Sequence, residues 1–141
     1  MAILPTQANN YEKQTLLNSD FSGQMLTDSE FDLANLQGSN FSGSDLRGVS
    51  LFGAKMQKTN FEGANLSYAT LDKAQFNRAN LKNAILEGAF AYNADFTDAN
   101  IEGADFTDVL FRKDMLMKLC SVAVGTNPTT GRETRETLYC D

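Results

Sequence analysis

The sequence predicts an all-β solenoid in which the chain turns a corner every five residues, and three observations lead to this fold class. A large apolar residue occupies almost every fifth position from residue 21 to residue 111. The position two residues before each of them is small, and Gln24 alone breaks this second series. Eight of the ten glycines lie two residues after a central position, where a tight turn favours them. A period of five fits neither a helix, at about 3.6 residues per turn, nor an alternating strand.

The central residue of each five-residue unit is expected to point into the interior of the solenoid. A short fixed period indicates stacked repeats, because one unit cannot bury its own apolar face. Ala91 is the one small centre in the array. The centres are Phe21, Leu26, Phe31, Leu36, Phe41, Leu46, Leu51, Met56, Phe61, Leu66, Leu71, Phe76, Leu81, Leu86, Ala91, Phe96, Ile101, Phe106 and Phe111.

Several units read Ala, then Asn or Asp, then a large apolar residue, and here the chain resembles the pentapeptide-repeat family, whose unit reads A(D/N)LXX. The resemblance covers about two-thirds of the chain without an insertion. It implies a right-handed quadrilateral β-helix of about five coils, with about four pentapeptides in each coil. The matching units are Ala64-Asn65-Leu66, Ala79-Asn80-Leu81, Ala94-Asp95-Phe96, Ala99-Asn100-Ile101 and Ala104-Asp105-Phe106.

Residues twenty apart agree with four sides, because like residues fall into like columns. Phe21, Phe41 and Phe61 share one column. The residue before the centre is often Asn or Asp, and these side chains are expected mainly to hold turns together. An amide ladder along one face is also expected. Its members are Asn40, Asn60, Asn80 and Asn100.

The ends of the chain are expected to differ from the array, since an open stack exposes strand edges. We expect an N-terminal cap over 1–17, the β-helix over 18–112 and a C-terminal helical cap over 113–141. Tyr11 is expected to lie over the first coil. Two short α-helices are expected in the C-terminal cap, at 113–120 and 132–140, on either side of a turn-rich loop.

Both cysteines of the chain, Cys120 and Cys140, lie in this C-terminal cap. An even pair that flanks a helix-loop-helix favours a disulfide. The alternative is two buried thiols in a reducing compartment. A zinc site would lack ligands, because the chain has two cysteines and no histidine.

The tail also resembles the C-terminus of thylakoid-lumen pentapeptide-repeat proteins of chloroplasts and their cyanobacterial relatives. The resemblance rests on Leu119-Cys120, on residues 125–131 and 134–136, and on Cys140. It implies the thylakoid lumen of the chloroplast and a mature form without its targeting sequence. The first ten residues show no secretory signal. A lumenal address suits a disulfide.

The chemistry of the chain gives no catalytic constellation. The net charge is −6 and histidine is absent, so acid–base work would fall to other side chains. The repeat sets the spacing of the acids in the last coils, so we expect no enzyme activity, cofactor, metal or small-molecule ligand. No segment has the apolar length of a membrane span, and the acidic balance disfavours nucleic acid. The acids are Glu87, Asp95, Asp98, Glu102, Asp105 and Asp108.

Two surfaces are candidates for binding a protein partner. Outward positions on the side of Ala91 form an apolar set, and exposed apolar clusters often mark partner sites. Underfilling at Ala91 offers a competing explanation, in which Phe90 rotates inward. The acids of the last coils form the second surface. This surface would suit a basic partner, and the alternative is an ordinary solvated surface. The apolar set consists of Phe52, Phe90, Tyr92 and Leu110.

The function that these features favour is a non-enzymatic structural or interaction module with an unidentified protein partner. One alternative is a DNA mimic, because some bacterial family members resemble duplex DNA and bind gyrase. The twelve basic residues of this chain weigh against that reading. The other alternative is a redox-responsive protein that uses Cys120 and Cys140.

Overall fold

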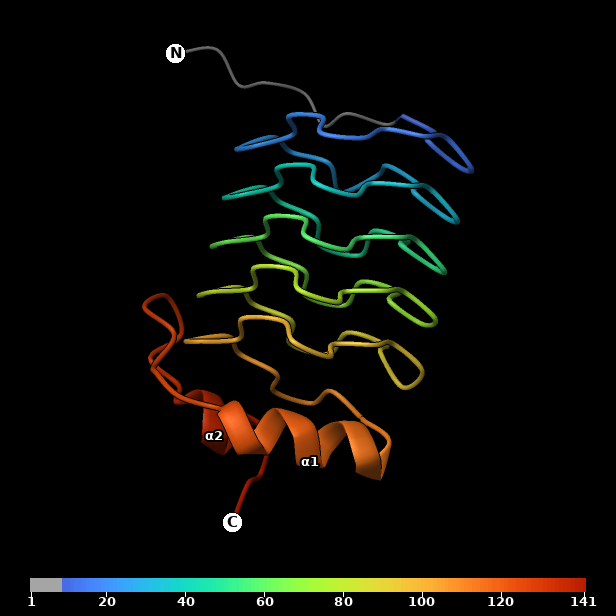
Figure 1. The fold of residues 1–141 in the computed structure, drawn as a ribbon. Helices are drawn as coiled ribbons and strands as arrows, with labels where there is room; N and C mark the ends of the chain where they lie inside the picture. The colour runs from blue at the N-terminus through green and yellow to red at the C-terminus, as the bar shows by residue number, and fades with distance from the viewer. Residues whose placement is uncertain (1–8) are drawn as a thin grey trace, which may run out of the picture.

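The computed structural model describes residues 9–141, which form a square stack of coils closed at its C-terminal end by helices (Figure 1). Parallel bridges join residues twenty apart, from Asn10 with Glu30 to Ile85 with Asp105. Each side of the square contributes one bridged residue, and the next turn follows at once. Twenty residues therefore make one coil of four sides. The described array is a quadrilateral β-helix whose sides are isolated bridges rather than extended strands.

Each side ends in the same hydrogen-bonded turn. The N–H of the small residue donates to the carbonyl oxygen of the central residue, as in Ala34 to Phe31 at 3.0 Å. Two residues after the centre, φ is positive at nearly every corner, for example 72° at Gly103. Preceding Asn and Asp side chains brace these turns. Asn60 Oδ1 accepts the Glu62 N–H at 2.9 Å, which is the expected role.

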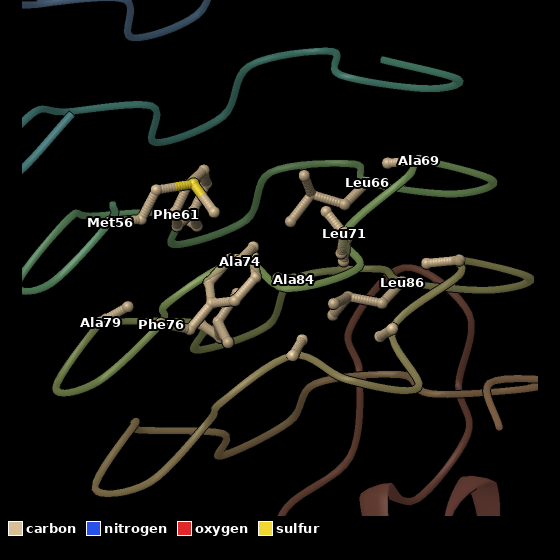
Figure 2. Close-up of a cluster of buried hydrophobic side chains, with 14 of the residues drawn as sticks. Met56, Phe61, Leu66, Ala69, Leu71, Ala74, Phe76, Ala79, Ala84 and Leu86 are labelled. Atoms are coloured by element: carbon tan, nitrogen blue, oxygen red, sulfur yellow. The ribbon is translucent and has the colours of Figure 1, made fainter. Parts of the chain in front are cut away.

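The interior of the solenoid is a packed column of the central side chains (Figure 2). From residue 26 to residue 106 every central residue is buried. Aromatic rings stack along the axis where centres twenty apart are both aromatic. The Phe41 ring lies 4.8 Å from Phe21 and 5.2 Å from Phe61, and Phe76 lies 4.7 Å from Phe96. Contacts between neighbouring coils therefore hold the array together.

The first coil begins earlier than the boundary expected between residues 17 and 18. Asn10 and Thr15 already bridge to the coil below. Tyr11 and Leu16 occupy central positions, and the Tyr11 ring stacks on Phe31 at 4.9 Å. The expectation was wrong for residues 10–17, because a tyrosine fills the interior there like the other centres. Residues 1–8 of the expected cap lie outside the described residues.

The C-terminal cap consists of α1 (Lys113–Val122) and α2 (Thr134–Thr137). Helix α1 lies across the last coil and buries Met115 and Leu119 (Figure 1). Helix α2 is shorter than the expected 132–140, because Glu133 is extended and bridges Thr126. In the described part of the chain, neither helix is long or apolar enough to cross a membrane.

A disulfide joins Cys120 at the end of α1 to Cys140 near the chain terminus. This is the pairing expected from the sequence. Both cysteines are half-buried and pack against the core. The Arg135 guanidinium donates to the Cys120 carbonyl oxygen at 2.9 Å and to the Asp141 carbonyl oxygen at 2.8 Å. The bridge and Arg135 together fix the two ends of the cap to each other.

Candidate interaction surface

The apolar surface beside Ala91 consists of large side chains on outward positions around a small, buried centre. Ala91 faces the interior and is 1% exposed. Phe90 and Tyr92 flank it on the outward positions, with 66% and 49% of their surfaces exposed. Phe90 therefore does not rotate inward to fill the space next to Ala91. Leu110 lies twenty residues after Phe90, in the same column, and is 72% exposed.

These three side chains line a cavity of about 470 Å³. Asp72, Asp108 and the remaining residues of 88–93 complete its lining. None of the lining residues is basic. The cavity thus combines apolar side chains with two acidic residues in one lining.

The turn that follows Ala91 has a different backbone conformation from most other turns of the array. Most residues two after a centre have positive φ, but Asn93 does not. Its N–H donates to Asp72 Oδ1 at 2.9 Å, and its side-chain amide lies 3.4 Å from Asp72 Oδ2. Asp72 is therefore held at the cavity by a contact between adjacent coils. Sequence reasoning did not single out Asp72, since nothing in the local pattern indicates this backbone conformation.

Phe52, the fourth residue of the apolar set, does not line the cavity. Its column position is that of Tyr92, two coils earlier, with Asp72 between them. The ring is half-buried, and the Lys73 ammonium lies 5.8 Å from its centroid. The structure thus brings together Phe90, Tyr92 and Leu110 and leaves Phe52 aside.

The acids of the last coils are less available than their positions suggest. The Arg132 guanidinium, from the C-terminal cap, lies 3.3 Å from both Glu87 and Asp105. Lys82 lies 3.4 Å from Glu102. The segment that carries these acids, residues 87–108, contains no basic residue. The pairing was therefore not expected from the sequence, because Lys82 lies before this segment and Arg132 lies after it. The acidic end is therefore partly neutralised.

Asp105 is a buried carboxylate with a complete set of partners. Burial alone would raise its pKa, but hydrogen bonds from Thr107 and Thr130 and the charge of Arg132 outweigh that effect. The net result is a lowered pKa. The Thr107 N–H donates to Asp105 Oδ1 at 2.9 Å. The ionised form of Asp105 is thus the one that the folded state prefers.

We predict that Asp105→Asn lowers the free energy of unfolding at pH 7 by about 1–2 kcal/mol, because the charged hydrogen bonds weaken. The folded pKa lies below the unfolded value of about 3.9, so the stabilisation is complete above pH 5. It is lost as the pH falls through the folded pKa. Urea unfolding of both proteins from pH 7 to pH 3 checks this. A difference that stays constant down to pH 3 would contradict it.

Within residues 9–141, no group of three or more His, Cys, Asp or Glu side chains could hold a metal ion. The cavity beside Ala91 also lacks a nucleophile paired with a base.

Comparison with known proteins identifies similar chains. The sequence pattern of the family described as pentapeptide repeats matches residues 13–43, 44–83 and 74–112, with eight copies. A curated relative, thylakoid lumenal 15 kDa protein 1, chloroplastic, of Arabidopsis thaliana is 59% identical over 39 residues. That match covers 28% of this chain and spans only 17% of the relative's length.

Two solved structures extend the likeness to the fold. One is a pentapeptide repeat protein from the Arabidopsis thaliana thylakoid lumen, with a TM-score of 0.87 and 41% identity over 92% of this chain and 90% of that one. The other is a pentapeptide repeat protein from Nostoc Pcc 7120, with a TM-score of 0.59 and 30% identity over 61% of this chain and 71% of that one.

Proposed function

This chain belongs to the pentapeptide-repeat family, whose fold is a right-handed quadrilateral β-helix, and from that premise we propose that it is a non-enzymatic protein-interaction module of the thylakoid lumen. The observation that carries this proposal is the exposed apolar surface of Phe90, Tyr92 and Leu110 around a cavity. The solenoid backbone holds these positions in place. Binding a partner would therefore cost little conformational entropy in this chain.

The lumenal address is proposed from the relatives. Both the curated relative and a solved structure similar over most of this chain are thylakoid-lumen proteins of Arabidopsis thaliana. The disulfide agrees with an oxidising compartment.

A pull-down from thylakoid-lumen extract tests the interaction role. Three baits are compared: the wild type, a double variant with Phe90→Ser and Tyr92→Ser, and a matched control with Phe52→Ser. Phe52 lies on the same side of the stack but does not line the cavity. The double variant is expected to lose a partner that the wild type and the control retain. If all three baits recover the same proteins, the Ala91 side is not the docking surface.

The DNA-mimic alternative gains no support from the charges. Arg132 and Lys82 pair with acids of the last coils, so the acidic end lacks the continuous negative charge of a duplex. A gyrase supercoiling assay with this chain is therefore expected to show no inhibition.

A redox response is a second candidate, and the Cys120–Cys140 disulfide favours it. An external dithiol would attack one sulfur, form a mixed disulfide and release the other cysteine as a thiol. Its second thiol would then resolve the mixed disulfide, so that the dithiol is oxidised and Cys120 and Cys140 are reduced. The C-terminal cap would lose its disulfide, while the coils would keep their backbone hydrogen bonds.

We predict that reduction destabilises the C-terminal cap by about 3 kcal/mol in the chain-entropy view of disulfides. Amide hydrogen exchange over residues 113–140 should quicken after dithiothreitol treatment, while exchange over residues 30–80 stays unchanged. A Cys120→Ser, Cys140→Ser variant should behave like the reduced protein under both conditions. Equal tail exchange before and after reduction would rule out a redox response through this disulfide.

A further inference from the structure

We propose that the cavity beside Ala91 binds an arginine side chain of a partner protein, flanked in the partner by an apolar residue. This inference rests on the proposed function and names the chemistry of the partner. The cavity combines exposed aromatic side chains with two acidic residues and has no basic residue in its lining.

The lining of the cavity is acidic, with Asp72 and Asp108 and no basic residue. Asp108 lines the cavity, and among the interactions of residues 9–141 its carboxylate has no hydrogen bond and no ion pair. Asp72 keeps one face toward the Asn93 amides, at 2.9 and 3.4 Å. Two acids that share a cavity without a cation favour a positively charged occupant.

Neighbouring bases do not satisfy these acids. The Lys73 ammonium lies over the Phe52 ring, 5.8 Å from its centroid. Arg112 lies twenty residues after Tyr92 and lines an adjoining hollow that shares Tyr92 and Asn93 with the cavity, but its Nε pairs with Asp114 at 3.6 Å. Among the described residues, no basic side chain forms an ion pair with Asp72 or Asp108.

The shape and the apolar surface of the cavity favour arginine over lysine. A guanidinium stacks on aromatic faces and pairs with carboxylates through its planar array of donors, whereas an ammonium acts as a point charge. Tyr92 and Phe90 supply the aromatic surface, and the volume of about 470 Å³ accommodates an arginine side chain with room for an adjoining group. Leu110, 72% exposed, offers contact to the apolar neighbour. An arginine next to an apolar residue thus matches each part of the cavity.

The test uses the full chain labelled with ¹⁵N and three blocked dipeptides as probes. These are N-acetyl-phenylalanyl-argininamide, its citrulline counterpart, which has the same shape without the charge, and its glutamate counterpart. The arginine probe is expected to shift the amide signals of Phe90, Tyr92 and Asn93 in a saturable way. It should bind about ten-fold more tightly than the citrulline probe, from the ion pair and the cation–π contact combined.

Asp108→Asn is the decisive variant, because asparagine tolerates the positive φ of 59° at this corner and the turn is kept. It should weaken the arginine probe about three-fold and leave the citrulline probe unchanged. Asp98→Asn is the matched control, since Asp98 occupies the same turn position with φ of 62° and lines another hollow. The control should bind like the wild type.

Each other result would overturn the inference. Equal binding of the arginine and citrulline probes would show a purely apolar site and would leave the proposed function standing. Preference for the glutamate probe, or no saturable shift with any probe, would exclude an arginine partner. Dimerisation in light scattering that Phe90→Ser abolishes would assign the surface to a second copy. The proposed function itself fails only if the pull-down with the Phe90, Tyr92 double variant loses nothing.

Discussion

Replacing Phe41 by Ala is expected to lower the free energy of unfolding by about 3–5 kcal/mol, the cost of emptying a buried aromatic position. The Phe41 side chain is fully buried. Its ring stacks between Phe21 and Phe61 and meets the edge of Phe31 at 5.6 Å. The backbone bridges on either side hold the coils at a fixed spacing, so the cavity cannot close by collapse. Urea unfolding followed by circular dichroism measures the loss.

Phe90→Ala is the matched control, because it removes the same atoms from a side chain that is 66% exposed. We expect it to change stability by less than about 1 kcal/mol. Hydrogen exchange adds a test of locality, since contacts in a repeat array join only neighbouring coils. Exchange near residues 21–61 should quicken more than exchange near α1. Equal losses for the two variants would contradict the central role given to the aromatic column.

The interior could be predicted from the sequence because one short rule decides each position. A side of five residues has room for one large and one small inward side chain, so Leu66 and Ala64 are fixed by counting. The same counting predicts the corners. Lys58, for example, adopts a positive φ of 59° where other coils have glycine. Position in the unit therefore overrides the ordinary preference of the residue.

The array was expected to start at residue 18, although Leu16 keeps the five-residue period, because Tyr11 before it is neither aliphatic nor phenylalanine. Tyr11 fills a central position at the open end, where its hydroxyl reaches the Asn9 side chain at 3.1 Å. A tyrosine centre is acceptable there and would be costly in the middle of the stack, where the hydroxyl would need a buried partner. At the open end of the stack, a central position can therefore hold a residue with a polar group.

The candidate surface was predictable only in part. Counting by twenty places Phe90 and Leu110 in one column, so their proximity follows from the period. The cavity between them depends on the unusual turn at Asn93 and on Asp72, which no spacing indicates. The pairing of Arg132 with Glu87 and Asp105 was equally hidden, because it depends on the path of the tail. Contacts made by irregular segments lie outside any periodic rule.

Asn127 shows how the tail is attached, and its replacement is the second large effect expected. The side chain is fully buried. Its amide donates to the carbonyl oxygens of Asn83, Ala84 and Gly103 at 3.2, 3.3 and 3.0 Å. Its Oδ1 accepts the N–H groups of Thr129 and Thr130 at 2.9 and 3.0 Å. One residue therefore links two coils to the loop before α2.

Asn127→Ala removes all five of these hydrogen bonds and leaves the carbonyl oxygen of the buried Gly103 without its partner, whereas the Ala84 carbonyl oxygen still accepts the Asp105 N–H at 2.9 Å. At about 1 kcal/mol for each bond, less some recovery by water, we expect the attachment of the tail to weaken by about 4 kcal/mol. Residues 124–137 should exchange their amides rapidly, while the coils from residue 30 to residue 80 remain protected. The disulfide keeps the chain end tethered to α1, so the tail should open as a loop rather than unfold completely.

Asn100→Ala is the matched control for this prediction. Asn100 is exposed, and its side chain makes the usual turn contact with the Glu102 N–H at 3.1 Å. Because water replaces that contact, we expect a loss of about 0.5–1 kcal/mol and no change in tail exchange. If Asn127→Ala were as mild as this control, the packing of Leu138 and Ala123 would have to hold the tail instead. The double variant with Cys120→Ser separates the two cases, because only a tail held by Asn127 would then detach fully.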